Sequence, residues 1–413
     1  MRRPEILAPA GDMERLQTAL LYGADAVYLS GRNYGMRSAC ANFTEQQMEE
    51  AVRLAHRRGA RVYVTCNTLA RNGEIDRLPI FLETVQQSGA DGLIVADLGI
   101  IAMAKQYAPR CDLHISTQTG IANYAAARAV YDMGAKRAVL ARELSLNEVA
   151  EIRAKAPAGL ELEAFVHGSM CMSWSGRCLL SNFLTGRDGE RGDCAQPCRW
   201  SYQLVEPGRP DQPLTIEEYP DGTYIFNAND LCMIEHIAAL AKAGVSSMKI
   251  EGRAKAAYYT AVTTNAYRMA ADAYEKSGFS ESYRPEKWIL DELEKVSHRP
   301  YGTGFYFGPP SQNTRSGGYI RCWEVAALVT GYDAGQIRLR QRNRFFNGES
   351  LEVLEPGRPP FTIVCDGLSN EQGEPVAAAS HADMLLCLPY PRPLATGAYL
   401  RKRVEDVSEH AHS

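Results

Sequence analysis

YGADAVYLS, residues 22–30, sets the pattern that decides the fold: a glycine, two residues, and then a short apolar run. Similar phrases follow as RRGARVYVT (57–65), SGADGLIVAD (88–97), MGAKRAVLAR (133–142) and AGVSSMKIEGR (243–253). A glycine just after a helix can adopt positive φ at little steric cost, and an unbroken aliphatic run indicates a strand buried on both faces. Helical patterns such as MERLQTALL lie between these runs. The chain therefore predicts the strand–helix alternation of a parallel sheet.

Eight strands of this kind can be counted. We expect them at 5–8, 26–30, 61–66, 92–96, 112–116, 137–141, 162–166 and 247–251. Eight βα units in about 270 residues favour an α/β fold of the (β/α)8, TIM-like barrel type over an open doubly wound sheet. No G-x-G-x-x-G follows a strand, which argues against a dinucleotide-binding domain.

The long gap between the seventh and eighth strands predicts an insertion within the barrel, which we place at 1–280. The insertion covers 168–245, and its middle (199–227) alternates like a β-hairpin. Asn229 or Asp230 is expected to cap the helix before the last strand. A linker with a short helix (281–317), a small all-β domain of barrel type (318–405) and a polar tail (406–413) would complete the chain.

Composition narrows the class of protein. The 413 residues are 45% hydrophobic and 23% charged, as in soluble globular proteins. No apolar run is long enough to cross a bilayer and no signal-peptide segment follows the N-terminal arginines, so we expect a cytoplasmic protein without a membrane partner. The net charge of −4 argues against a wholly basic surface for nucleic acid but allows a local patch. Eleven cysteines in such a chain favour thiols or metal ligands over disulfides.

Four cysteines open the insertion in the pattern C-x6-C-x15-C-x3-C: Cys171, Cys178, Cys194 and Cys198. They follow a barrel strand, so they should lie on the active-site face, at the carboxyl ends of the strands. Zinc sites usually use C-x2–4-C pairs, and only the last two cysteines meet that spacing. An iron–sulfur cluster accepts four thiolates at irregular spacing. We favour a 4Fe–4S cluster, with zinc as the alternative and with Cys40 or Cys232 as possible replacement ligands.

Polar residues just past the strands form a second group of candidates. Arg142, Lys249 and Arg253 could hold an anionic small molecule, although salt bridges that support the barrel mouth are the alternative interpretation. The candidate acid–base residues are His167, Glu143 and Glu251. His167 beside Cys171 would also suit a thiol nucleophile of a peptidase, but four clustered thiols favour ligation.

Cations and aromatic rings are interleaved among the cysteines. The set resembles a surface that binds phosphates and stacks bases, with a solvated basic loop as the alternative: Arg177, Arg187, Arg191 and Arg199 with Trp174, Phe183, Trp200 and Tyr202.

The run EAFVHGSMCMSWSGRCLLS (163–181) closely resembles the signature of the collagenase-like peptidase family, number thirty-two of the U series. The stretches at 5–31, 116–123, 141–146, 185–200 and 247–253 resemble the same family, so the likeness covers nearly the whole chain. The cysteine pattern and the β domain are most similar to the members that modify tRNA.

This resemblance implies a specific function. It implies oxygen-independent hydroxylation of the tRNA wobble uridine to 5-hydroxyuridine, with prephenate as hydroxyl source and a cluster on the four cysteines. Electron donors or cluster-assembly proteins would be further partners. A flipped-out uridine would contact Trp174, Gln118 and Asn67. The β domain would grip the anticodon stem through Arg338, Arg340, Arg342, Arg344, Arg401, Lys402 and Arg403. A peptidase remains the alternative function, although the resemblance supplies no catalytic nucleophile.

Overall fold

The computed structural model describes residues 2–36, 41–171, 173–200, 202, 227–311, 313 and 318–404. Cys40, the tail at 406–413 and most of the predicted hairpin at 199–227 lie outside the described residues. No helix in the described ranges has the length and apolar character needed to cross a membrane.

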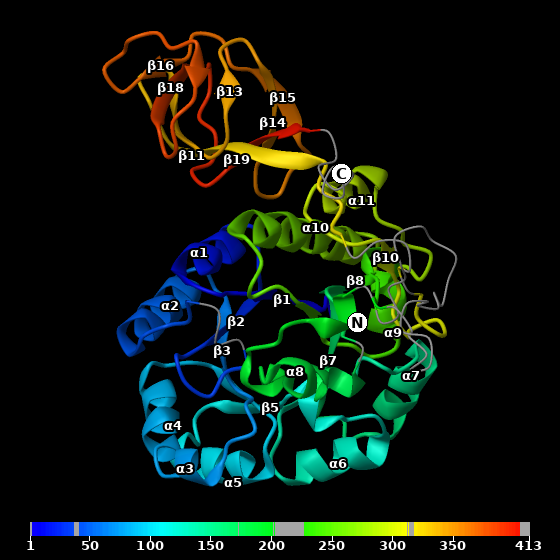
Figure 1. The fold of residues 1–413 in the computed structure, drawn as a ribbon. Coiled ribbons are helices and arrows are strands. Elements are labelled where there is room, and N and C mark those ends of the chain that lie inside the picture. The colour runs from blue at the N-terminus through cyan, green and yellow to red at the C-terminus, as the bar shows by residue number, and fades with distance from the viewer. Residues whose placement is uncertain are drawn as a thin grey trace, which may run out of the picture.

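Eight parallel strands close into a barrel (Figure 1), which confirms the predicted fold class. They are β1 (Glu5–Pro9), β2 (Ala26–Ser30), β3 (Arg61–Cys66), β4 (Gly92–Val95), β5 (Asp112–Ile115), β6 (Arg137–Val139), β7 (Glu161–Gly168) and β9 (Ser247–Ile250). Strand β9 pairs in parallel with both β1 and β7, and these two pairings close the ring.

Helices surround the barrel and lie between successive strands, with two of them, α3 and α4, between β3 and β4. They are α1 (Met13–Leu21), α2 (Glu45–Arg57), α3 (Asn72–Ile75), α4 (Leu78–Gln87), α5 (Leu98–Tyr107), α6 (Tyr124–Asp132), α7 (Leu146–Lys155), α9 (Ile237–Lys242) and α10 (Ala257–Lys276). The glycine of the opening motif, Gly23, has a φ of 94° just past α1. Gly244 has a φ of 92°, and a Cβ there would lie 2.2 Å from Cγ of Arg153. These turns need glycine for both reasons.

Two short strands extend the sheet beyond the barrel. Strand β8 (Asp230–Cys232) pairs antiparallel with β7, and β10 (Tyr301–Gly302) pairs in parallel with β8. The predicted helix cap at Asn229 or Asp230 is therefore wrong, because α9 begins only at Ile237. The carboxylate of Asp230 instead accepts hydrogen bonds from the backbone and guanidinium of Arg299, 69 residues later.

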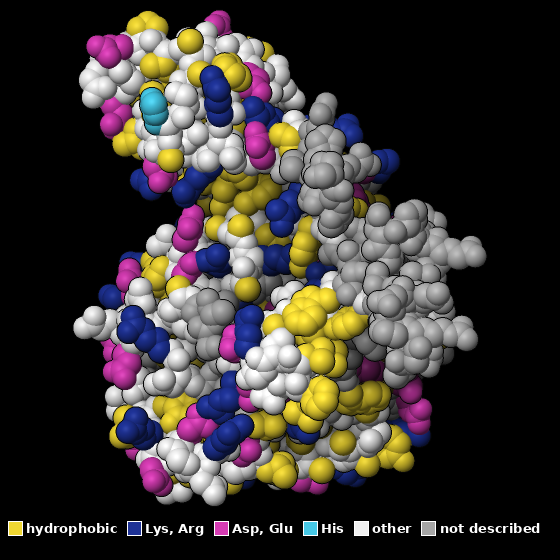
Figure 2. All heavy atoms as spheres, viewed as in Figure 1, with side chains coloured by type: hydrophobic (Ala, Val, Ile, Leu, Met, Phe, Trp, Pro, Cys, Tyr) yellow, Lys and Arg dark blue, Asp and Glu magenta, His cyan; other side chains and the backbone are white. Residues whose placement is uncertain are grey.

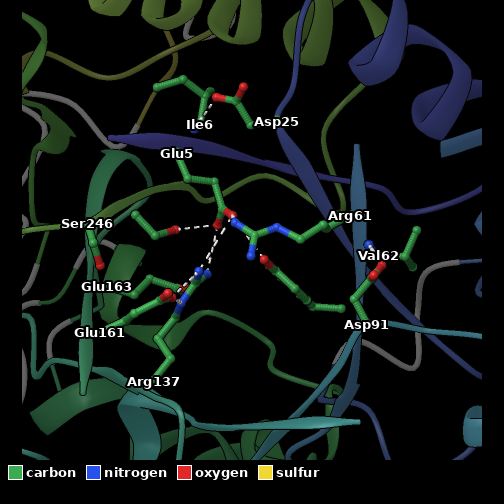
Figure 3. A network of polar contacts seen from close by, with 12 residues as sticks. Glu5, Ile6, Asp25, Arg61, Val62, Asp91, Arg137, Glu161, Glu163 and Ser246 are labelled. Atoms are coloured by element: carbon green, nitrogen blue, oxygen red, sulfur yellow. Dashed lines mark hydrogen bonds and ion pairs between the residues drawn. The ribbon is translucent and has the colours of Figure 1, made fainter. Parts of the chain in front are cut away.

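A buried ionic network fills the floor of the barrel (Figure 3). The guanidinium of Arg137 contacts the carboxylates of Glu5, Glu161 and Glu163 at 2.6–3.0 Å. Burial alone would raise the pKa of Glu5, but the charges of Arg137 and Arg61 bring it below its ordinary value. Glu163 also pairs with Lys249 at 2.8 Å. A chain of ion pairs thus runs from the floor to the middle of the barrel.

The C-terminal region is all β, as predicted. Seven strands form an antiparallel sheet: β11 (Trp323–Asp333), β12 (Gln336–Gln341), β14 (Ser350–Leu354), β15 (Phe361–Val364), β16 (Ser369–Asn370), β18 (Leu385–Pro389) and β19 (Tyr399–Arg403). Strands β13 (Phe345–Phe346) and β17 (Ala378–Ala379) form a separate pair. This region has its own hydrophobic core and packs beside α10 and α11 (Lys287–Leu293), as Figure 1 shows.

Arg401 joins the two domains. Its side chain is fully buried and bonds to both oxygens of Glu292 on α11, at 2.6 and 2.7 Å, and to Glu352 at 2.8 Å. Lys402 is mostly buried and bonds to Glu349. The structure therefore removes Arg401 and Lys402 from the predicted RNA grip. The other predicted cations remain exposed: Arg338 and Arg340 on one face of β12, and Arg342, Arg344 and Arg403.

Candidate functional site

The insertion after β7 folds over the carboxyl ends of the barrel strands. It contains the short helices η2 (Trp174–Gly176), α8 (Leu180–Thr185), η3 (Gly189–Arg191) and η4 (Pro197–Arg199). In Figure 1, α8 lies in front of the barrel mouth. We call residues 169–200 the cysteine loop. It encloses a cavity of about 230 Å³ between itself and the strand ends, called here the barrel cavity.

All four predicted metal ligands line the barrel cavity, together with most of the predicted substrate-binding residues. The predicted residues that line it are Cys171, Cys178, Cys194, Cys198, Asn67, Gln118, Arg142, Lys249, Glu251 and Arg253. The cysteines come from the cysteine loop, and the other residues come from four barrel strands (β3, β5, β6 and β9) or the segments after them. The fold therefore brings ten of the thirteen predicted residues into one place.

Carboxylates tie the cysteine loop to the barrel. Glu143 accepts hydrogen bonds from the backbone N–H and the hydroxyl of Ser175, which has a φ of 48° in a tight turn. Glu190 accepts from the backbone N–H of Cys178 at 3.0 Å and from the amide of Gln118 at 3.5 Å. The amide of Asn67 donates to Gln118 at 2.9 Å. A polar chain thus links strand ends to a cysteine backbone.

The surroundings of the thiols suit thiolate ligands. Backbone N–H groups of Leu180 and Gln196 donate to the sulfurs of Cys178 and Cys194, at 3.4 and 3.3 Å. Such bonds stabilise negative sulfur. Burial raises the pKa of Cys198; the charge of Arg199 opposes this, and the neighbouring thiols add to it. The thiol would therefore lose its proton most readily on binding a cation. In the described part of the chain, no three His, Cys, Asp or Glu side chains converge on the position of a single metal ion.

Ion pairs and a ring contact hold the cations of the barrel cavity in position. Arg142 pairs with Glu251 at 2.9 Å, and its guanidinium lies 3.7 Å from the centre of the Phe165 ring. Its Nε is buried and has no hydrogen-bond partner among the described residues. Lys249 pairs with Glu163. Arg253 is only 3% exposed.

The wall of the cavity carries charges of both signs. Arg142, Lys249 and Arg253 line it together with Glu190 and Glu251, and the buried Glu163 pairs with Lys249. The ion pairs that the sequence suggested as an alternative do exist, but they leave donors on the cavity wall. An anion can therefore bind without separating these pairs.

His167 does not line the barrel cavity. Alternation along β7 would direct it inward with Glu163 and Phe165, but a register shift between Phe165 and His167 turns it away. Its ring lies among those of Tyr259, Tyr267 and Tyr301, with centroids 5.4–6.0 Å apart, and neither ring nitrogen has a partner among the described residues. Burial lowers the pKa of His167 to about 3. The thiol–histidine pair considered for a peptidase is not formed.

Cys232 also lies away from the cavity. It sits on β8 opposite His167, and burial raises the pKa of its thiol to about 12. Cys198, in contrast, lines the cavity with the other three cysteines. Cys198, and not Cys232, therefore lies with the other three cysteines.

A second cavity, of about 250 Å³, lies beside the first, and sequence reasoning missed it. Glu143 and Trp174 line this second cavity and not the barrel cavity. Cys171 and Ser173 line both. Much of its wall comes from residues 302–311, within the predicted linker. The glycines and prolines of GTGFYFGPP were the signal there, since they indicate a turn-rich segment that helices and strands do not use.

The outer surface of the cysteine loop carries both exposed hydrophobic side chains and basic side chains. Trp174, Leu179, Phe183 and Trp200 are 42–84% exposed. Figure 2 shows hydrophobic side chains gathered over this part of the barrel face, with cations around them. Of the predicted arginines, Arg177 is exposed, whereas Arg187 and Arg191 pair with Asp193 and Glu74.

Comparison with known proteins identifies the family. The model of peptidase family U32 matches residues 11–316, and that of the U32 C-terminal domain matches residues 321–401. The chain is 38% identical over 386 residues to tRNA hydroxylation protein P1 of Bacillus subtilis, covering 92% of this chain and 90% of the relative. It is 34% identical to tRNA hydroxylation protein P of Escherichia coli, covering 95% of each chain. The barrel with its cysteine loop and the β domain thus correspond to the two parts of one family, and the chain belongs to peptidase family U32.

Proposed function

We propose that this protein hydroxylates a uridine of tRNA without using dioxygen. In this proposal an iron–sulfur cluster binds to Cys171, Cys178, Cys194 and Cys198, and the hydroxyl group comes from a prephenate-like dicarboxylate. The observation that carries the proposal is that four thiols and three cations line the same cavity. The names of the relatives, tRNA hydroxylation proteins, support the choice of tRNA.

The arrangement of the thiols favours a cluster over zinc. A tetrahedral zinc ion with bonds of about 2.3 Å needs its four sulfurs about 3.8 Å apart. The four thiols line one cavity, yet no three of them converge to the position of a single ion. A 4Fe–4S cluster places each thiolate on a different iron atom and so accepts a wider arrangement. When bound, the cluster would supply one-electron chemistry at the roof of the cavity.

The overall reaction balances without another reactant. Replacing the C5 hydrogen of uridine with hydroxyl is a two-electron oxidation of the base. The donor must therefore accept those two electrons as it gives up oxygen, so that U–H and R–OH become U–OH and R–H. An electron-donating protein would then serve only to set the starting oxidation state of the cluster.

The residues of the barrel cavity fit a dicarboxylate as the donor. The Nε–H of Arg142 is buried and has no partner in the part of the chain that the structure describes, and Lys249 and Arg253 add two positive charges. Charge-assisted bonds of this kind are stronger than neutral ones. Lys249 is held in position by its ion pair with Glu163, and Arg142 by its ion pair with Glu251, before the anion binds.

The proposal is tested by cofactor analysis and by genetics. Protein purified without oxygen should contain about four iron and four sulfide per chain, and Cys→Ser changes at positions 171, 178, 194 and 198 should each lower both. Cys232→Ser is the matched control and should keep both. Expression in a strain that lacks its own tRNA uridine hydroxylation protein should restore 5-hydroxyuridine, measured by mass spectrometry of tRNA nucleosides. Zinc in place of iron, or tRNA that stays unmodified, would contradict the proposal.

A further inference from the structure

The second cavity carries an inference that rests on the proposed function and extends it. We propose that this cavity receives the target nucleobase after it leaves the RNA stack. The base and the anion then meet where the two cavities adjoin. The observation is that Cys171 and Ser173 line both cavities, so the cavities adjoin at these two residues.

The two cavities differ in charge. Three cations line the barrel cavity, whereas Glu143 is the single charged residue among those described in the wall of the second cavity. Its carboxylate is already bonded to the backbone and hydroxyl of Ser175. Met170, Phe305 and Pro310 make the rest of the wall apolar. An anionic donor is therefore favoured in the barrel cavity, and a neutral flat ring in the second one.

Trp174 provides a stacking face for that ring. The side chain lines the second cavity and is 56% exposed, so it stands at the rim. The indole lies beside the turn at Gly120, where an added Cβ would be 3.5 Å from its Nε1. Exposed aromatic rings are the usual platforms for unstacked bases.

Two buried polar atoms of residues in this wall are of the kinds, an acceptor and a hydroxyl, that the edge of uracil can pair with. Oδ1 of Asn229 and Oγ of Ser173 are buried, and neither has a hydrogen-bond partner in the described part of the chain. The Nδ2 of Asn229 donates to Ser311 at 2.7 Å, which directs the amide oxygen elsewhere as a free acceptor. Uracil offers an N3–H donor between two carbonyl acceptors, so the amide oxygen and the serine hydroxyl complement it. An unpaired buried polar atom is costly, and a bound base removes that cost.

Photocrosslinking locates the base directly. The probe is an anticodon stem-loop RNA with 5-iodouridine at the wobble position, bound to the full-length protein and irradiated. Fragmentation of the crosslinked peptide in the mass spectrometer should locate the crosslink on Trp174 itself, because Phe165 and Trp174 lie on the same tryptic peptide (156–177). A crosslink to Tyr28 or Phe165, the aromatic residues of the barrel cavity, would overturn the inference.

Affinity measurements give a second, independent test. Trp174→Ala should weaken binding of the intact stem-loop by about 5- to 150-fold, the range for loss of one stacked base. It should leave unchanged the affinity for a stem-loop that is abasic at the wobble position. Trp288→Ala, on α11, is the matched control and should bind both RNAs like the native chain.

The outcomes separate this inference from the proposed function. If the native chain binds no stem-loop at all, the proposed function itself fails. If it binds the stem-loop but Trp174→Ala weakens the intact and the abasic RNA equally, or neither, then the base does not enter the second cavity.

Discussion

Replacing His167 with phenylalanine should make the protein less sensitive to acid. The imidazole lies among three tyrosine rings and is 1% exposed, and neither of its nitrogens has a hydrogen-bond partner among the described residues. Phenylalanine keeps a flat ring and breaks no hydrogen bond. At pH 8 we therefore expect His167→Phe to change the free energy of unfolding by less than about 1.5 kcal/mol, as for other volume-conserving changes in a core.

The effect at low pH follows from the pKa of His167, which burial, with the charges of His298 and Lys255, lowers to about 3. The unfolded chain takes up a proton near pH 6.5, whereas the folded chain does not until about pH 3. The contribution of neutral His167 to the free energy of unfolding is therefore complete above pH 6.5 and is lost as the pH drops from 6.5 to 3. At pH 5 the loss is about 1.5 pKa units, or about 2 kcal/mol at 1.36 kcal/mol per unit.

The nearby tyrosines and Cys232 do not contribute to the pH dependence of stability in this range. Burial raises the pKa of Tyr259, Tyr267 and Tyr301 well above 10, and that of Cys232 to about 12, so all four stay neutral between pH 5 and 8.

Guanidinium unfolding of the native chain and His167→Phe at pH 8, 6.5 and 5 measures the difference. The variant should gain about 2 kcal/mol relative to the native chain between pH 8 and pH 5. The exposed His381→Phe is the control, and its difference from the native chain should stay constant. A difference for His167→Phe that does not change with pH would refute the reasoning. Because His167 lies outside the barrel cavity, the variant should also keep tRNA modification, and loss of modification would restore an acid–base role for this residue.

Three further changes test the buried charges. Glu163→Gln removes the fully buried partner of a buried lysine and should lower the free energy of unfolding by about 3–5 kcal/mol. The same change at the exposed Glu151 should cost about 0.5 kcal/mol or less, and equal losses in denaturant titrations would contradict the role of burial. Arg401→Met should cost a similar 3–5 kcal/mol and separate the melting transitions of the two domains in calorimetry, whereas a single unshifted transition would show that this ion pair does not join them. Arg142→Gln should weaken binding of prephenate by about 10- to 150-fold in titration calorimetry, from the loss of a charged hydrogen bond, and unchanged affinity would place the anion elsewhere.

Sequence reasoning succeeded where local pattern and tertiary position agree. Unbroken aliphatic runs indicate strands that are buried on both faces. Glycines after helices indicate turns with positive φ, as at Gly23 and Gly244. The four cysteines and the cations after the strands were predictable as one site because all parallel strands of a barrel end at the same face.

The failures depend on contacts between residues far apart in the chain. Asp230 has the chemistry of a helix cap, but its carboxylate binds Arg299 instead. From the alternation along β7, the side chain of His167 should point into the barrel, but a register shift between Phe165 and His167 turns it away. Arg401 looks like a surface cation, and only the position of Glu292 on α11 makes it a buried one. The second cavity was hidden for the same reason, because Trp174 and residues 302–311 meet only in the folded chain.

The buried guanidinium at the domain boundary has a consequence for molecular selection. Arg401 bonds to Glu292 on α11 and to Glu352 in the β domain, so a rotation of one domain against the other would have to break a buried ion pair. A polymer that touches both the loop over the barrel and the exposed arginines of β12 must already have a matching bend. The selectivity of binding among RNAs would then depend on the shape of the RNA before it depends on base identity.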